Sequence, residues 1–309
     1  MSGSTPAAAG VLAALSDDLS RAVAHAARSV VAIHARRRIP SSGIVWRPGV
    51  IVASNGTIAR DDDITVTLPD GSSASATLAG RDSTTDIAVL RAGATLRTAD
   101  RGDPASLVPG KLVLAVGRPG GSPTASMGVV SAVDGEWRTW HGGRIDQFVR
   151  LDLAIYDGFS GGALVEAGGR VLGMNSSRLA RSIALAIPAA TVDRVVDQVL
   201  ATGGVSRGYL GIASQPVRLP DPLRQAHDLG PLGLVVVALE PQGPAERAGV
   251  MLGDILVALD GKPVSDPAEL LAALGPDRVG HALELRALRG GQLVGIAITV
   301  GRRTEAGRR

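Results

Sequence analysis

Short apolar segments that alternate with turn signals run along most of this chain, and they constrain its fold more than any other feature. GIVWRPGVIVAS, DITVTLPDG and KLVLAVGRPGG are examples, each with its own glycine, proline or Asp-Gly pair. Many short strands at such regular spacing predict antiparallel β-barrels. The 40 glycines fit frequent tight turns, and aromatic residues at only 2% leave Val, Leu, Ile and Ala to fill the cores.

Two helical segments and a second unit interrupt this pattern. Residues 11–28 predict an Ala-rich amphipathic helix, and AATVDRVVDQVLATGG predicts another that stops at Gly203 and Gly204. SDPAELLAALG predicts a helix capped by Ser265 or Asp266, between further strands. We therefore expect four parts with a boundary near residues 201–207: an N-terminal helical segment (1–24), a first domain (25–203), a second domain (208–302) and a disordered tail (303–309).

Composition excludes several classes of function. The chain has no cysteine, so it has no disulfide, thiolate zinc site or cysteine nucleophile, and its five histidines lack metal-ligand spacing. We expect no metal and no cofactor. The net charge is only +3, and the one dense basic run, Arg36 to Arg38, reads as a solvated turn, so we expect no nucleic-acid partner.

The N-terminal residues carry one short apolar patch without a preceding Lys or Arg. Asp17 and Asp18 follow it closely. Such a segment is a poor signal peptide and is too short to span a membrane. The sequence therefore predicts a cytoplasmic protein with no membrane span.

Several motifs, taken in order, resemble a known family. They are DITVTLPDG with AGRDSTTDIAVLRA, then TASMGVVSAV, LDLAIYDGFSGGAL, and GYLGI with PAERAGVMLGDILVALDGKPV. Over roughly residues 25–302 the chain resembles the HtrA/Deg family, in which a trypsin-like serine protease domain precedes a PDZ domain. The resemblance implies a mainly β fold: a chymotrypsin/trypsin-like double β-barrel, then a PDZ domain, which is an α+β partly open barrel.

The same resemblance implies a catalytic site that lacks one member. Ser160 matches the nucleophile, Asp86 matches the triad aspartate, and the N–H groups of Gly158 and Ser160 match the oxyanion donors. The family carries its histidine in a T-N-x-H-V segment. An ungapped match places that histidine at Gly56, and residues 49–80 contain no histidine.

The remaining histidines lie elsewhere in the predicted structure. They fall in the first helix, the first strand, a hairpin tip and the second domain: His25, His34, His141, His227 and His281. Since the triad requires tight mutual geometry, we expect none of them to replace the missing base.

These observations predict an inactive protease homologue. A glycine offers no base, and loss of the histidine from such a triad costs about a million-fold in turnover. Asp157 adds an acidic group near the oxyanion donors, and Phe159 is bulky where the family carries a small polar residue. Two alternatives stay open: an active serine endopeptidase with a non-standard general base, and a regulatory subunit of an active homologue.

The resemblance also implies surfaces that bind peptides. It places an apolar specificity pocket at Leu153, Ala154, Ile155 and Met174, although these residues could equally fill the core. GYLGI resembles the loop that presents backbone N–H groups to a terminal carboxylate, beside a strand edge and a helix. Candidates for this groove, of which at least one leucine must be core, are Tyr209, Leu210, Gly211, Ile212, Leu270, Leu271 and Leu274. The expected partners are peptides, unfolded segments and protein C-termini, and the oligomeric state stays open.

Overall fold

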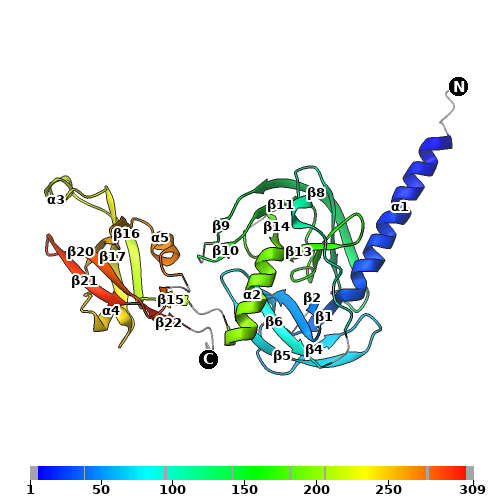
Figure 1. Ribbon diagram of the computed structural model, residues 1–309, viewed down its shortest axis with the longest axis horizontal. Coiled ribbons are helices and arrows are strands. Elements are labelled where there is room, and N and C mark those ends of the chain that lie inside the picture. The colour runs from blue at the N-terminus through cyan, green and yellow to red at the C-terminus, as the bar shows by residue number, and fades with distance from the viewer. Residues whose placement is uncertain are drawn as a thin grey trace. The chain divides into compact units, whose positions relative to one another are not determined.

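The computed structural model of the protein divides into two compact units. It describes residues 6–37, 39–93, 96–140, 142–180, 183–204, 207–275 and 278–303. One unit comprises Met1–Thr139 and Gly143–Gly204, and the other comprises Trp140–Gly142 and Val205–Arg309. Figure 1 shows strands in both units.

The first six strands of the first unit close into an antiparallel barrel in the order β1-β2-β3-β6-β5-β4. Apolar side chains from these strands fill its interior, among them Ile33, Ile51 and Leu90, which are fully buried. The strands are β1 (Val30–His34), β2 (Ser41–Arg47), β3 (Val50–Ser54), β4 (Ile64–Thr67), β5 (Ser73–Asp82) and β6 (Ile87–Ala92).

A second closed barrel follows, in the order β11-β14-β13-β12-β7-β8. Its strands are β7 (Leu112–Gly117), β8 (Thr124–Asp134), β11 (Phe148–Asp152), β12 (Ala163–Glu166), β13 (Val171–Ser176) and β14 (Ala184–Pro188). A separate hairpin pairs β9 (Trp137–Arg138) with β10 (Arg144–Ile145), and short 3-10 helices η1 (Ala27–Ser29), η2 (Asn55–Thr57) and η3 (Pro104–Ser106) lie between strands. The predicted double barrel is confirmed.

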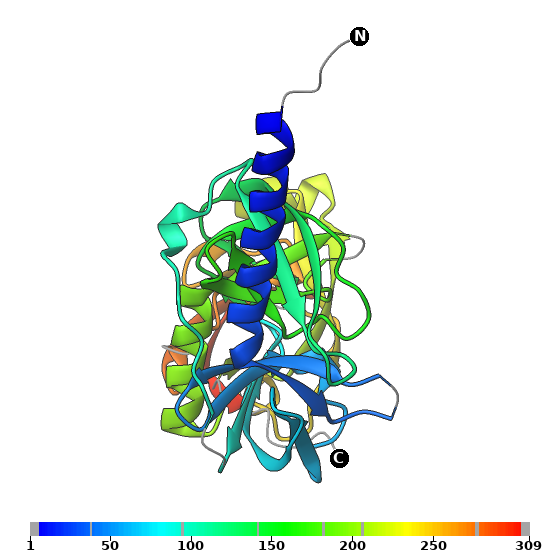
Figure 2. The same ribbon diagram turned by 90° about the vertical axis from the view of Figure 1, so that its right-hand side faces the viewer.

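Two helices complete the first unit. Helix α1 (Pro6–Ala26) begins and ends earlier than the predicted span of 11–28. Figures 1 and 2 show its N-terminal half projecting away from the barrels, and Val11, Leu12 and Leu15 are exposed there. Helix α2 (Ala189–Thr202) packs its valines against strands of both barrels and ends at Gly203, whose left-handed φ of 76° caps it as expected. Among the described residues, no helix is both long and apolar enough to cross a membrane.

A buried arginine ties the end of α1 to the barrels. The guanidinium of Arg118 donates to the backbone oxygens of Ala27 (2.9 Å), Val30 (2.7 Å) and Gly121, and burial lowers its pKa. Its backbone N–H donates to the hydroxyl of Ser42 (2.8 Å). Backbone oxygens at the start of η1 and of β1 and in the loop after β7 thus stabilise a cation that would otherwise be costly to bury.

The second unit is the confirmed PDZ fold. Its main sheet runs in the order β16-β17-β18-β20-β21, with β19 on β18, and a separate pair joins β15 to β22. The strands are β15 (Arg207–Tyr209), β16 (Ile212–Arg218), β17 (Leu232–Leu239), β18 (Ile255–Leu259), β19 (Lys262–Pro263), β20 (Ala282–Arg289), β21 (Gln292–Thr299) and β22 (Gly301–Arg303). The helices are α3 (Asp221–His227), α4 (Pro244–Arg247) and α5 (Pro267–Ala272).

The start of α5 and the end of the second unit can be compared with the predicted ones. Asp266 is the N-cap of α5, and Glu269 completes a capping box with it. Arg303 lies in β22, and the rest of the expected tail, 304–309, falls outside the described residues.

Candidate active site

Ser160 lies in the loop between β11 and β12, where backbone bonds fix it against β13. The N–H of Gly161 donates to the oxygen of Asn175 (2.9 Å), and the N–H of Asn175 donates to the oxygen of Gly162 (2.8 Å). The Ser160 side chain is nearly buried. Its hydroxyl pairs with that of Ser177 at 2.7 Å and accepts from the Ser177 N–H at 3.1 Å.

Asp86 lies just before β6 and is buried, with 4% of its surface exposed. The hydroxyls of Ser54 and Ser176 both donate to its Oδ2 at 2.7 Å, and the N–H of Gly56 donates to its Oδ1 at 2.9 Å. Burial raises the pKa of this carboxyl, against the opposite pull of these hydrogen bonds and of the charge on Arg178. Three donors therefore hold a buried acid in a fixed orientation.

The end of β13 brings the two predicted residues together. Ser176 donates to Asp86, and the next residue, Ser177, pairs with Ser160. Two consecutive residues, Ser176 and Ser177, therefore connect the acid position to the nucleophile position. What fills the space between them decides the chemistry, because a base must reach both groups.

The side chain of Arg178 lies over Gly56, the position that the family resemblance gives to the histidine. A β-carbon built on Gly56 would lie 1.8 Å from Cδ and 2.0 Å from Nε of Arg178. A guanidinium stays protonated in proteins and cannot accept a proton from a serine. Arg178 follows β13 by two residues and was not among the residues predicted from the sequence.

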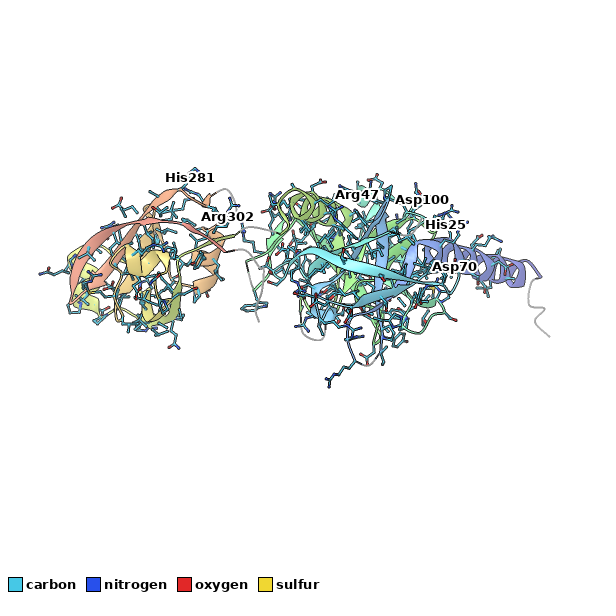
Figure 3. All side chains as sticks on the ribbon, turned by 90° about the horizontal axis from the view of Figure 1, so that it is seen from below. His25, Arg47, Asp70, Asp100, His281 and Arg302 are labelled. Carbon is cyan, nitrogen blue, oxygen red and sulfur yellow. The ribbon has the colours of Figure 1, made fainter. Side chains whose placement is uncertain are left out.

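The other histidines make their contacts elsewhere. His34 Nε2 lies 2.8 Å from the hydroxyl of Thr67, and His227 Nε2 lies 3.1 Å from a backbone oxygen of its own unit. Figure 3 shows His25 beside Asp100, 3.4 Å from its carboxylate, and His281 on the second unit. None of these four described histidines bonds to the Ser160 or Asp86 side chain, and the fifth, at position 141, lies outside the described residues.

The serine loop keeps two available donors. Within the described residues, the N–H groups of Gly158 and Ser160 donate to no other group. Phe159 is fully buried and packs edge-to-face on Tyr156 at 5.4 Å between ring centroids, so its bulk lies in the interior. Asp157 is exposed.

The residues predicted for the specificity pocket differ in exposure. Leu153 and Ile155 are half-buried, Ala154 is exposed, and Met174 is fully buried in β13. Leu153 packs on the core of the second barrel. An apolar pocket built by all four residues stays a prediction.

The PDZ loop combines an open strand edge with uncommitted donors. β16 is an edge strand of its sheet, and the N–H groups of Leu210 and Gly211 donate to no other group in the described part of the chain. Their carbonyls accept from Ala245 and Glu240, both at 2.8 Å, which fixes the loop.

The side chains predicted for the PDZ groove divide into two groups. Leu210, Leu270 and Leu274 belong to the buried core, and Ile212 is half-buried against it. Leu271 is 46% exposed. The remaining candidate, Tyr209, pairs with β22 through its backbone.

Comparison with known proteins gives a consistent result. The Trypsin-like peptidase domain family matches residues 41–174, and the PDZ domain family matches residues 208–300. A probable periplasmic serine endoprotease DegP-like of Halomonas elongata is 35% identical over 275 residues, which are 86% of this chain and 57% of the relative. One from Pseudomonas savastanoi is 36% identical over 84% of this chain and 55% of its own. The chain thus spans a little over half the length of the curated relatives that it matches.

Solved structures agree over nearly the whole chain. The serine endoprotease from Yersinia pestis matches with a TM-score of 0.71 and 30% identity, over 92% of this chain and 98% of its own. The HtrA-type protease AlgW with a decapeptide matches with a TM-score of 0.70 and 29% identity, over 92% and 98%.

One expectation is wrong. The cytoplasmic location rested on the N-terminal residues alone, whereas the relatives are named periplasmic endoproteases. The barrels, the PDZ unit and these matches agree, and the chain belongs to the HtrA/DegP family of trypsin-like serine proteases that carry a PDZ domain.

Proposed function

We propose that this protein is a catalytically inactive HtrA-type homologue that binds peptides or unfolded protein segments. The observation that carries the proposal is the arginine side chain over Gly56. Gly56 provides no base, and the stem of Arg178 occupies the space in which a base would sit. The hydroxyl of Ser160 instead forms a hydrogen bond with the hydroxyl of Ser177, and a serine hydroxyl does not remove a proton at neutral pH.

The PDZ unit supports the peptide-binding half of the proposal. An extended peptide can add to the open edge of β16, and its terminal carboxylate can accept from the N–H groups of Leu210 and Gly211. The solved AlgW structure is named with a decapeptide. By the names of its relatives, we also place this activity in the periplasm.

An active endopeptidase is the second candidate. Retention of Ser160 and Asp86, with two uncommitted oxyanion donors, favours it, as do the relatives named endoproteases. It requires a base from outside the described residues or from a partner subunit. A regulatory subunit of an active homologue would share the inactive site of the first proposal.

Labelling with a serine-directed phosphonate separates the two main candidates. The purified chain and Ser160→Ala are incubated with the reagent, read by intact mass, and tested in parallel for casein digestion. The proposal predicts no adduct and no cleavage by either protein. An adduct on the wild-type chain, absent from Ser160→Ala, would refute it, and His34→Ala and His141→Ala would then test which histidine acts as the base.

A further inference from the structure

Loss of the catalytic base does not by itself explain why a charged guanidinium, that of Arg178, lies at this site. The residue is exposed, and its side chain makes no hydrogen bond or ion pair with the described residues. Only its backbone N–H is bonded, to the hydroxyl of Ser176 at 3.2 Å. A cation with five N–H donors thus lies over Gly56 without a fixed partner.

Asp86 does not take that role. Its two oxygens already accept from Ser54, Ser176 and the N–H of Gly56. The charge of Arg178 acts on Asp86 at a distance, and the two side chains form no ion pair. The Asp86 carboxylate therefore has its hydrogen-bond donors from Ser54, Ser176 and Gly56. The guanidinium of Arg178 has no acceptor among the described residues.

Further donors lie on the serine loop, where Ser160 bonds to Ser177, the neighbour of Arg178 in the chain. The N–H groups of Gly158 and Ser160 have no acceptor among the described residues, and the Ser160 and Ser177 hydroxyls form a pair beside them. A carboxylate has two oxygens, each able to accept more than one hydrogen bond, and its planar fork matches a guanidinium. We propose that the site around Ser160 binds a carboxylate, with one oxygen at these backbone N–H groups and the other at Arg178.

The chemistry favours the C-terminal carboxylate of a peptide over other anions. Asp157 is exposed one residue before Gly158 and repels any anion, and this repulsion is about twice as large for a doubly charged phosphate monoester as for a singly charged carboxylate. Half-buried Leu153 and Ile155 precede the serine loop and suit an apolar chain end. The inference rests on the proposed loss of the base, and it gives the barrel unit a ligand site separate from the PDZ loop.

Photo-crosslinking of the full chain tests this inference. The probe is a peptide of p-benzoylphenylalanine followed by Ala-Val-Val, made with a free C-terminal carboxylate and as the C-terminal amide. Crosslinks are mapped by mass spectrometry and titrated separately for residues 153–178 and residues 209–218. Wild type is compared with Arg178→Ala and with Arg91→Ala, which removes an exposed arginine of the first barrel. Circular dichroism checks that each variant is folded.

In wild type and in Arg91→Ala, we expect half-maximal crosslinking of residues 153–178 at a concentration of the free-acid peptide at least tenfold lower than that of the amide. The reason is that hydrogen bonds to charged groups are stronger than neutral ones. In Arg178→Ala that ratio should fall to about one. Equal labelling by acid and amide at residues 153–178 of wild type, or a ratio that survives Arg178→Ala, would overturn the inference. Labelling confined to residues 209–218 would also overturn it, while the proposed peptide binding would stand. Cleavage of the probe would instead refute the proposed inactivity.

Discussion

Introducing a histidine at position 56 should activate Ser160 fully only when Arg178 is removed as well. In Gly56→His the new β-carbon would overlap Cδ of Arg178 at 1.8 Å. Carbon atoms in contact lie about 3.5 Å apart, so the arginine must retreat by roughly 1.7 Å whichever way the imidazole turns, because the backbone fixes the β-carbon. Arg178 would also compete with the imidazole for the charge of Asp86, which the triad needs.

The magnitudes make the comparison decisive. A triad histidine is worth about a million-fold, so even a poorly aligned one should raise the rate of phosphonate labelling at Ser160 by about 100-fold. We expect that gain in Gly56→His/Arg178→Ala, and about tenfold less in Gly56→His alone, because residues in contact couple by about 1–2 kcal/mol. Rate constants come from intact mass at timed intervals, with Arg178→Ala alone as the control. Equal rates in the single and double variants would refute the reasoning, since Arg178 would then not exclude the base.

Three further predictions concern stability. Because burial raises the pKa of Asp86, the contribution of this residue to stability should be largest below the usual aspartate pKa of about 3.8 and should be lost as pH rises through the raised value. Asp86→Asn should remove that loss and raise Tm at pH 7, as calorimetry from pH 3 to 8 would show; a lower Tm at pH 7 would contradict it. Hydrogen bonds from Arg289 hold the pKa of buried Asp254 low, so its contribution is present above about pH 3.8 and is lost as pH falls. Asp254→Asn should cost about 2 kcal/mol in urea unfolding at pH 7, and no change would sink this assignment. Gly161→Ala places a β-carbon 2.2 Å from a backbone oxygen of β2 and should cost more than about 3 kcal/mol, whereas Gly71→Ala, with a similar φ and open space, should cost about 1 kcal/mol; equal costs would rule out the steric argument.

Much of the fold could be predicted from local patterns. Alternating apolar segments and turn residues indicated the two barrels, and the helix stop at Gly203 and the cap at Asp266 were correct in detail. These features depend on neighbours in the chain, which a sequence displays directly. The start of α1 could not be placed as well, because an exposed helix end has no packing to define it.

The site was harder to predict, because it depends on contacts between distant segments. The prediction that Gly56 stands at the histidine position followed from motif order. Arg178 lies on the other barrel, and nothing in its local sequence indicates where its side chain points. The serine loop shows the same limit. Phe159 looked like a disturbance of the loop, and only the packing shows that its ring points into the interior against Tyr156.

The contacts of Arg118 set the smallest piece of this chain that can fold by itself. The family match starts at residue 41, yet Arg118 donates to carbonyls at Ala27 and Val30, and β1 closes the first barrel between β2 and β4. A fragment cut at the family boundary would leave two strand edges unpaired and a buried cation without two of its three acceptors. The autonomous folding unit therefore reaches back into the last turn of α1, while the exposed turns before it contribute little to its cooperativity.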